Sequence, residues 1–202
     1  MRLIELVETS AEVASTRSRL AKAKSLGDLL VRAGADEVEI AVAFLMGEPR
    51  QGRIGIGYAT LRDARDAPSA DAPSLSLEDV DRKLGELKAV AGKGAASERL
   101  RRLRALFELT VPAERDFLAR LLIGELRQGA LEGLMVDAIA RAGKLPLEDV
   151  RRGVMVSGEP ATVARTALAE GAAGLARFRI ELFRPLQPML AQPAEDAGDA
   201  LA

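Results

Sequence analysis

The sequence contains no cysteine, no histidine and no tryptophan in its 202 residues. Without Cys or His, disulfide frameworks, zinc fingers, haem ligation and catalysis by Cys or by a Ser–His pair are excluded, so only carboxylate, lysine and hydroxyl chemistry is left. Aromatic residues are scarce as well, with five Phe and one Tyr. Six aromatic side chains are too few to line a base-stacking groove for single-stranded nucleic acid, and we expect them in the core.

An excess of charge of one sign and long apolar runs are also lacking. Lys and Arg number 29 against 30 Asp and Glu, which gives a formal net charge of −1. Net charge averages over all faces of a protein, so a local stripe of arginines can be hidden within this balance. No apolar run approaches the roughly 20 residues that span a bilayer, and the N-terminus has no long apolar stretch with a cleavage site after it. These absences predict a cytoplasmic protein without membrane contact.

Helical patterns account for most of the chain, because Ala, Leu, Arg and Glu fill long stretches and β-branched clusters are few and short. We expect the second helix to begin at an N-cap, Ser10, and to end at Gly34, and we expect Ser76 and Ser97 to cap later helices. Residues 65–74, rich in Pro, Ala, Asp and Ser, predict an exposed connection. The other expected helices cover 3–7, 36–46, 76–87, 99–107, 117–126, 131–142 and 147–156, and another opens at 157–160.

The C-terminal part has a different pattern. From Arg177, the stretch RFRIELF alternates polar and apolar side chains with period two, which is typical of a strand, and the prolines that follow exclude a helix. The sequence therefore predicts an all-α fold: one helical domain over residues 1–176, followed by an extended segment over residues 177–202 that includes a short strand.

An internal repeat organises the helical part. Residues 25–52 align without gaps with residues 102–129, and the ends of the two segments read GEPRQG (47–52) and GELRQG (124–129). Such self-similarity predicts a duplication. Two helical halves, about residues 10–64 and 95–156, would then pack about a pseudo-two-fold axis and present two similar loops on one face.

The shared G-E-x-R-Q-G loop suits contact with phosphate. Its glycines let backbone N–H groups approach a partner, and its arginine, Arg50 or Arg127, offers a fork of donors for phosphate oxygens. Each loop also precedes a helix whose positive N-terminal end favours anions. Two such loops, separated across a two-fold axis, could hold the two phosphate backbones beside a duplex groove without reading the sequence. The alternative interpretation is ordinary helix C-cap chemistry with a solvated arginine.

A second candidate anion site is the Gly92–Gly94 turn, with Ser97 behind it and a basic run that begins at Arg99. This run fits either phosphate contact or a solvated helix face. The turn lacks the spacing and the preceding strand of a nucleotide P-loop, and GRIGIG at residues 52–57 lacks both features of a dinucleotide fingerprint. We therefore predict no nucleotide at either place.

Four stretches carry a family resemblance: GRIGIGYATL, GKGAASERLRRLRALF, FLARLLIGELRQGALEGLMVDAIARA and FRPLQPMLAQP. They resemble the N-terminal DNA-binding domain of bacterial and archaeal-type ATP-dependent DNA ligases, and with the helices between them they cover almost the whole chain. The resemblance implies an all-helical, pseudo-two-fold domain that grips the minor groove of nicked duplex DNA. Relatives often have a basic or neutral residue at the position of Glu125, so DNA contact is not expected there.

The resemblance, the repeat and the second turn together give the candidate DNA-binding residues. The equivalent of GELRQGAL makes loop contacts to the DNA backbone in this family, and the repeat extends that role to the first loop. The complete set is Gly47, Arg50, Gly52, Arg53, Gly92, Lys93, Gly94, Ser97, Arg99, Gly124, Arg127, Gly129 and Leu131.

The resemblance also implies what this chain does not do. In the family, a catalytic lysine within a K-x-D-G motif belongs to the adenylation domain that follows a segment like PMLAQP, and no K-x-D-G occurs here. We expect no catalytic residues and no cofactor or metal in this chain, with ATP and Mg²⁺ used only by the absent catalytic domains. The expected partners are double-stranded, nicked DNA in replication, repair and recombination, and the catalytic domains of the same ligase, and the module is expected to be a monomer.

Two other classes of function remain as alternatives. A helical protein-interaction scaffold would expose an apolar groove instead of a basic face. An enzyme that uses only carboxylates and Lys would have a deep pocket with convergent acids of shifted pKa. Arginines gathered on one face favour DNA and scattered arginines favour the scaffold, and the residues to place are Arg50, Arg53, Arg99, Arg127 and Arg152.

Overall fold

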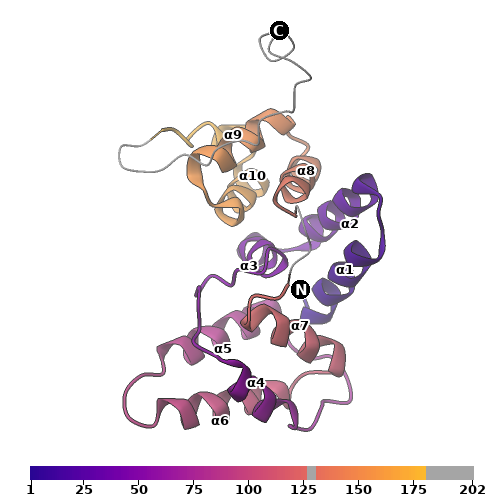
Figure 1. Cartoon of the computed structure of the whole chain (residues 1–202). Coiled ribbons are helices and arrows are strands. Elements are labelled where there is room, and N and C mark those ends of the chain that lie inside the picture. The colour runs from indigo at the N-terminus through magenta and orange to yellow at the C-terminus, as the bar shows by residue number, and fades with distance from the viewer. Residues whose placement is uncertain (127–130, 181–202) are drawn as a thin grey trace, which may run out of the picture.

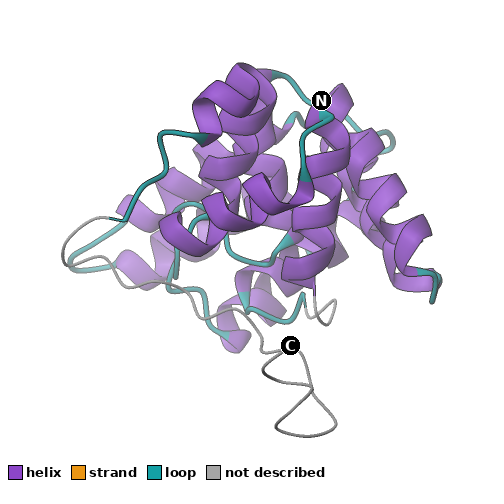
Figure 2. Ribbon diagram, turned by 90° about the horizontal axis from the view of Figure 1, so that it is seen from above, coloured by secondary structure: helices purple, strands orange, loops and turns teal. Residues whose placement is uncertain are grey.

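The computed structural model describes residues 1–126 and 131–180. Within these ranges the chain forms ten α-helices and no strand, so the predicted all-α class is confirmed (Figure 2). None of these helices is long and apolar enough to cross a membrane. The helices are α1 (Leu3–Ser15), α2 (Arg19–Arg32), α3 (Ala35–Leu45), α4 (Tyr58–Arg65), α5 (Leu77–Ala89), α6 (Ala95–Phe107), α7 (Pro112–Leu122), α8 (Leu131–Gly143), α9 (Leu147–Ser157) and α10 (Pro160–Leu175).

The helices are arranged in three groups. Figure 1 shows α4 to α7 at one end of the molecule, α8 to α10 at the other end, and α1 to α3 between them. The middle group joins the two ends, because α2 packs on α8, α3 packs on both α10 and α5, and α1 packs on α7. At the lower end in that view, α6 packs against α4 and α5.

One hydrophobic cluster runs through all three groups and includes buried residues from every helix. Phe44, Phe107 and Phe117 are fully buried in it, as expected of scarce aromatic residues. Tyr58 is the exception, because 66% of its surface is exposed. The prediction that it belongs to the core was wrong.

The caps of the helices were predicted with mixed success. Ser76 caps α5 as predicted, since its hydroxyl oxygen accepts a hydrogen bond from the Asp79 N–H at 3.0 Å. Ser10 does not begin a helix, because it lies buried inside α1, and Ser18 caps α2 instead. Ser97 is likewise inside a helix, because α6 begins after Gly94.

The two segments aligned by the repeat have the same local structure. Helices α3 and α7 occupy the same stretch of the alignment and end with the same turn. At the start of each helix a glutamate side chain in the first turn accepts from the N-cap backbone: the Gly34 N–H donates to Glu37 at 3.2 Å and the Val111 N–H donates to Glu114 at 3.1 Å. The duplication and its pseudo-two-fold axis remain predictions.

Two further differences concern connections. The stretch 65–74 is the expected connection, but the short helix α4 just before it was not predicted. In the C-terminal part, residues 178–180 form neither helix nor strand, so the described start of the predicted strand is not one. The rest of that strand and the linker to residue 202 lie outside the described residues.

Candidate nucleic-acid interface

Both G-E-x-R-Q-G loops begin with the same helix-ending turn. In the first, Gly47 has φ +78° and the Glu48 N–H donates to the Ala43 carbonyl at 2.9 Å. In the second, Gly124 has φ +71° and the Glu125 N–H donates to the Arg120 carbonyl at 2.8 Å. Glycine takes such positive φ values without steric cost, so the first glycine of each loop serves as a helix C-cap.

The two loops start side by side. A Cβ on Gly47 would lie 3.3 Å from the carbonyl oxygen of Leu126, and the Tyr58 hydroxyl donates to Glu125 Oε1 at 2.7 Å. The described starts of the two loops are therefore close together, with Gly47 against Leu126. Arg127 and Gly129 lie outside the described residues, and Leu131 is the first residue of α8.

The first loop continues into residues 52–57, a segment that is neither helix nor strand and has two distinct sides. Ile54 and Ile56 are buried at 3% and 8% exposure, whereas the residues that alternate with them, Arg53, Gly55 and Gly57, are exposed. Among the described residues, no backbone N–H from 53 to 57 donates to a protein acceptor. Backbone N–H groups need acceptors. This segment therefore offers the backbone N–H groups of three exposed residues, Arg53, Gly55 and Gly57, as donors without an acceptor among the described residues, and Arg53 is the one long side chain of the three.

Cations from the ends of α5 and α6 surround this segment. Lys88 donates to the Arg53 carbonyl, and Arg99 donates to the Val90 carbonyl at 2.7 Å. A Cβ on Gly55 would lie 3.6 Å from Arg99 Nη1, so this guanidinium lies directly beside the segment. Lys93 is exposed in the turn between the two helices. Neither Arg53 nor Lys93 has an ion-pair partner in the part of the chain that the structure describes.

The remaining candidates of the second turn lie at the same place. Gly92 and Gly94 are exposed with φ +84°, and a Cβ on either would meet no atom within 4 Å. Gly52 is similarly open, with φ +62°. Ser97 is exposed on the first turn of α6. The structure therefore brings the 52–57 segment and the 92–94 turn into one surface, which we call the amide face: residues 52–57 and 92–94 with Lys88 and Arg99.

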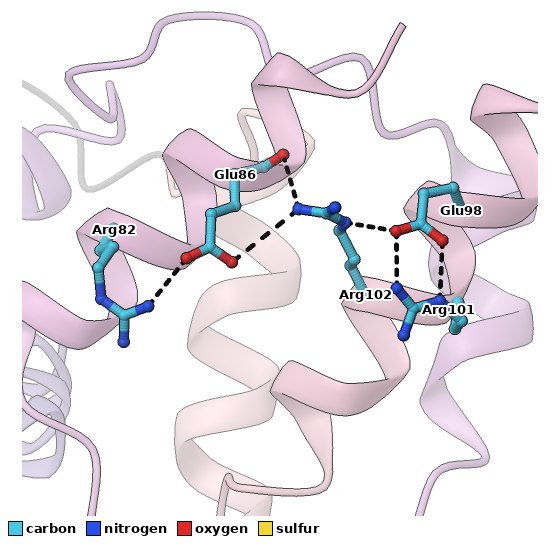
Figure 3. Close-up of polar contacts among 5 residues, drawn as sticks. All are labelled: Arg82, Glu86, Glu98, Arg101 and Arg102. Carbon is cyan, nitrogen blue, oxygen red and sulfur yellow. Dashed lines mark hydrogen bonds and ion pairs between the residues drawn. The ribbon is translucent and has the colours of Figure 1, made fainter.

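The basic run on α6 is largely neutralised by acids (Figure 3). Glu98 accepts hydrogen bonds from Arg101 at 2.7 Å and from Arg102 at 2.6 Å, and these two bonds, Arg101 first, lower the Glu98 pKa to about 2. Arg102 also lies 4.0 Å from Glu86 on α5, which accepts from Arg82 at 2.8 Å. This row of alternating charges links α5 to α6. The ion pairs of Arg101 and Arg102 therefore favour the interpretation of this run as a solvated helix face over its interpretation as a set of phosphate contacts.

The arginines chosen to separate DNA binding from a scaffold fall into two places. Arg53 and Arg99 share the amide face. Arg152 lies on α9 at the opposite end of the molecule and pairs with Asp149 at 3.3 Å. Arg50 lies just before the face, but its side chain turns to Asp81 on α5.

A polar cleft of about 530 Å³ lies beside Arg50, between α3, α5 and α10. Its acids do not have the signature of general acid–base catalysis. The pKa of Asp79 is lowered, first by the hydrogen bond from the Ser76 hydroxyl and then by Arg82. The enzyme hypothesis therefore has no support from this cleft. The charged residues that line it are Asp36, Glu39, Arg50, Glu78, Asp79, Asp81, Arg82 and Arg165.

Glu114, on α7, is a buried acid that lies away from this cleft. It has 0% exposure, and its Oε2 accepts from the Val111 N–H at 3.1 Å, so it caps α7. Burial raises the pKa of Glu114, and the backbone N–H groups of Val111 and Ile4 oppose the rise. Its carboxyl group is therefore easier to keep protonated in the folded chain than in the unfolded one.

This raised pKa predicts how stability depends on pH. The contribution of Glu114 is fully present below its ordinary pKa of 4.5 and is lost as pH rises through the raised folded-state value. Replacing Glu114 with Gln keeps a capping oxygen but cannot ionise. The free energy of unfolding of E114Q, measured by urea titration, should increase relative to that of the wild type as pH rises from about 4 to 7. A difference that is constant over this range would contradict the prediction.

The fold and the amide face define a helical module that offers free backbone donors and cations at one end. Residues 60–140 match the family described as DNA ligase N terminus. Over these residues the chain is therefore similar to the N-terminal part of DNA ligases.

Three relatives, each named Probable DNA ligase, illustrate the similarity. The chain is 52% identical to the protein from Anaeromyxobacter sp. (strain Fw109-5), over 100% of this chain and 39% of that relative. It is 48% identical to the protein from Rhodococcus jostii (strain RHA1), over 97% of this chain and 39% of the relative. It is 47% identical to the protein from Sorangium cellulosum (strain So ce56), over 100% of this chain and 38% of the relative. The chain thus spans about two-fifths of the length of these relatives.

Sequence reasoning missed several residues that shape this surface. Lys88 gave no signal, because a lysine near the end of a helix is common, and its bond to the Arg53 carbonyl joins residues 35 positions apart. Asp81, the buried partner of Arg50, gave only a weak signal. A carboxylate on the apolar side of a helical wheel, next to Val80 and Leu84, was the only hint.

Proposed function

We propose that this chain is the module with which an ATP-dependent DNA ligase holds nicked double-stranded DNA, through the minor groove and the phosphate backbone and without reading the sequence. The observation that supports it best is the amide face, where the backbone N–H groups of the exposed residues 53, 55 and 57 have no acceptor in the part of the chain that the structure describes. Phosphate and sugar oxygens are acceptors that every DNA sequence offers at the same spacing. The ligase names of the relatives point to the same partner.

The shape of the 52–57 segment suits a narrow groove. Gly57 is exposed, and a Cβ there would meet no atom within 4 Å, so its backbone can approach a duplex closely, while the Arg99 guanidinium lies beside Gly55. Arg53 and Lys93, which have no ion pair among the described residues, would neutralise phosphates on either side. In this proposal Gly124 and the second loop lie beside the same duplex, because that loop touches the first.

The proposal assigns the chemistry of ligation to other domains. ATP, Mg²⁺ and the K-x-D-G lysine would belong to the catalytic domains of the longer protein, which would be this module's partners in replication and repair, and the isolated chain would act as a cytoplasmic, non-catalytic monomer. Incubating the chain with ATP and nicked DNA should then give neither sealed product nor a lysyl-adenylate. Either product would refute this part of the proposal.

A helical interaction scaffold is the second candidate. The observation in its favour is a hollow of about 240 Å³ with a mainly apolar lining between α2, α3, α8 and α10, next to the exposed Val31. Its lining is made mostly of alanines and valines, so it offers little area to a partner. Absence of duplex binding by the folded wild-type chain would favour this candidate.

The salt dependence of binding tests the proposal directly. With three to four cations on phosphates, the observed association constant for a nicked duplex should fall with a log–log salt slope of about −3. Fluorescence anisotropy with a labelled nicked duplex at several salt concentrations measures this slope. Duplexes of unrelated sequence serve as the control and should bind within a few-fold of one another. A slope near zero, or strong preference for one sequence, would overturn the proposal.

A further inference from the structure

Two consecutive side chains of the first G-E-x-R-Q-G loop end on one buried carboxylate, Asp81. Asp81 is only 8% exposed, and its Oδ1 accepts from Arg50 Nε at 3.2 Å and from Gln51 Nε2 at 3.0 Å. Arg50 Nη2 donates to its other oxygen, and Gln51 Nε2 also reaches the Asp81 backbone carbonyl at 2.9 Å. The loop is thereby fastened to α5 by four hydrogen bonds.

Helix α5 holds the segment that follows at a second point. Lys88 lies seven residues after Asp81, on the same side of the helix, and donates to the carbonyl of Arg53. Between these two anchors, the Gly52 N–H donates to the Pro49 carbonyl at 2.7 Å and closes the turn. These hydrogen bonds therefore fix the position of the backbone at the point where the amide face begins.

The surroundings of Arg50 disfavour a phosphate partner. Arg50 lies between Asp81 and Glu39, whose Oε2 is 3.9 Å from Nη1, and the pKa of Arg50 is raised chiefly by the Asp81 hydrogen bonds. The adjoining cleft carries five carboxylates against three guanidinium groups. A phosphate that approached Arg50 from this side would meet net negative charge and would have to compete with a partly buried ion pair.

We propose that Asp81 is a positioning residue for DNA binding: together with Arg50 and Gln51 it fixes the first loop so that the backbone N–H groups of the exposed residues 53, 55 and 57 meet the duplex, and Arg50 itself does not touch DNA. This inference rests on the proposed function and adds to it a division of labour within the loop. The arginine and the glutamine of the motif bind Asp81 within the protein, and the contacts to DNA are made by the backbone and by Arg53.

The test compares Asp81→Ala with Glu78→Gln, a matched change that removes one carboxylate from the same cleft without touching the loop. If only net charge mattered, both variants would bind DNA more tightly. Positioning predicts that D81A weakens binding to a nicked duplex by roughly tenfold, because a loosened site loses its alignment. The salt slope should stay unchanged, since no phosphate contact is removed, and E78Q should bind at least as tightly as the wild type.

Arg50→Ala gives an independent readout. A positioning role predicts weaker binding with an unchanged slope, and it predicts that D81A and R50A together cost no more than either alone. Direct phosphate contact would instead reduce the slope by about 0.9. Circular dichroism and thermal unfolding identify any variant that fails to fold. If D81A does not fold, Asp81→Asn replaces it. Because this variant keeps an acceptor oxygen for Arg50, its expected loss of DNA affinity is smaller.

The outcomes separate the two proposals. If D81A binds as well as the wild type or better, or if R50A lowers the slope by about one, the positioning role is overturned and the DNA-binding proposal survives. If the wild-type chain itself binds no duplex, both are overturned. Weaker binding of D81A and R50A with the wild-type slope supports the inference.

Discussion

Replacing Arg53 and Lys93 together with glutamine should weaken binding to a nicked duplex by roughly 60-fold at 0.1 M monovalent salt. Each phosphate contact contributes about 0.9 to the log–log salt slope, so losing two contacts should make the slope shallower by about 1.8. Both side chains are exposed and have no ion pair among the described residues, so their removal should leave the fold intact. Anisotropy titrations at four or more salt concentrations measure both quantities.

The matched control changes the same number of charges elsewhere. Arg17, before α2, and Arg32, at its end, are exposed and lie away from the amide face (Figure 1). The R17Q/R32Q variant has the same net charge as R53Q/K93Q, so a general charge effect would weaken both equally. We expect the control to keep the wild-type slope. Equal loss in the two variants would mean that DNA binding, if present, does not use the amide face.

The helices could be predicted from the sequence where local signals agree. Residues 36–46 were predicted as a helix and α3 spans Ala35–Leu45, because an apolar stripe and the Gly47–Pro49 break point to the same ends. The wrong start at Ser10 has a physical reason. Ser10, Ser15, Thr16 and Ser18 are all capping residues, and only packing, which buries Ser10 at 3% exposure, selects Ser18.

The candidate site could be predicted only in part. The glycine loops were found because a repeat and a motif are visible in a linear sequence, and the 92–94 turn was found for the same reason. Their placement was not visible. Arg50 meets Asp81 from 31 residues away and the two loops touch across the fold, so neither the ion pair nor the shared surface has a local signal. The 52–57 segment contributed to the family resemblance and gave two candidates, Gly52 and Arg53, but its alternation of Ile with Gly and Arg, which implies one buried and one open side, was not used.

Arg115 illustrates the same limit for stability, and its replacement with alanine should cause the largest loss of stability among single surface-accessible sites. Its guanidinium donates to four backbone carbonyls, two from Nη1 and two from Nη2, at distances of 2.6 to 3.0 Å. These carbonyls belong to Arg65, Ala67, Pro68 and Phe107, so one side chain fastens the connection after α4 to the end of α6. The same group lies 5.6 Å from the centroid of the Phe107 ring.

The expected cost follows from what alanine would leave behind. Four carbonyls would lose a charged donor in a partly buried place, and the free energy of unfolding should fall by roughly 3 kcal/mol. Arg115→Lys keeps the charge but not the planar fork, so it should recover only part of this loss. Arg62→Ala is the control, because Arg62 is 80% exposed and pairs only with its neighbour Asp63. That variant should stay within about 0.5 kcal/mol of the wild type.

Urea unfolding followed by circular dichroism separates these outcomes. If R115A shares the midpoint of R62A, the four carbonyls are satisfied by water and the connection after α4 does not depend on Arg115. If R115A is destabilised as expected, folded R115A at low temperature should still bind a nicked duplex with the wild-type salt slope. The reason is that Arg115 holds the connection after α4 and is not part of the amide face. Stability and DNA contact would then be assigned to different arginines of the same end of the molecule.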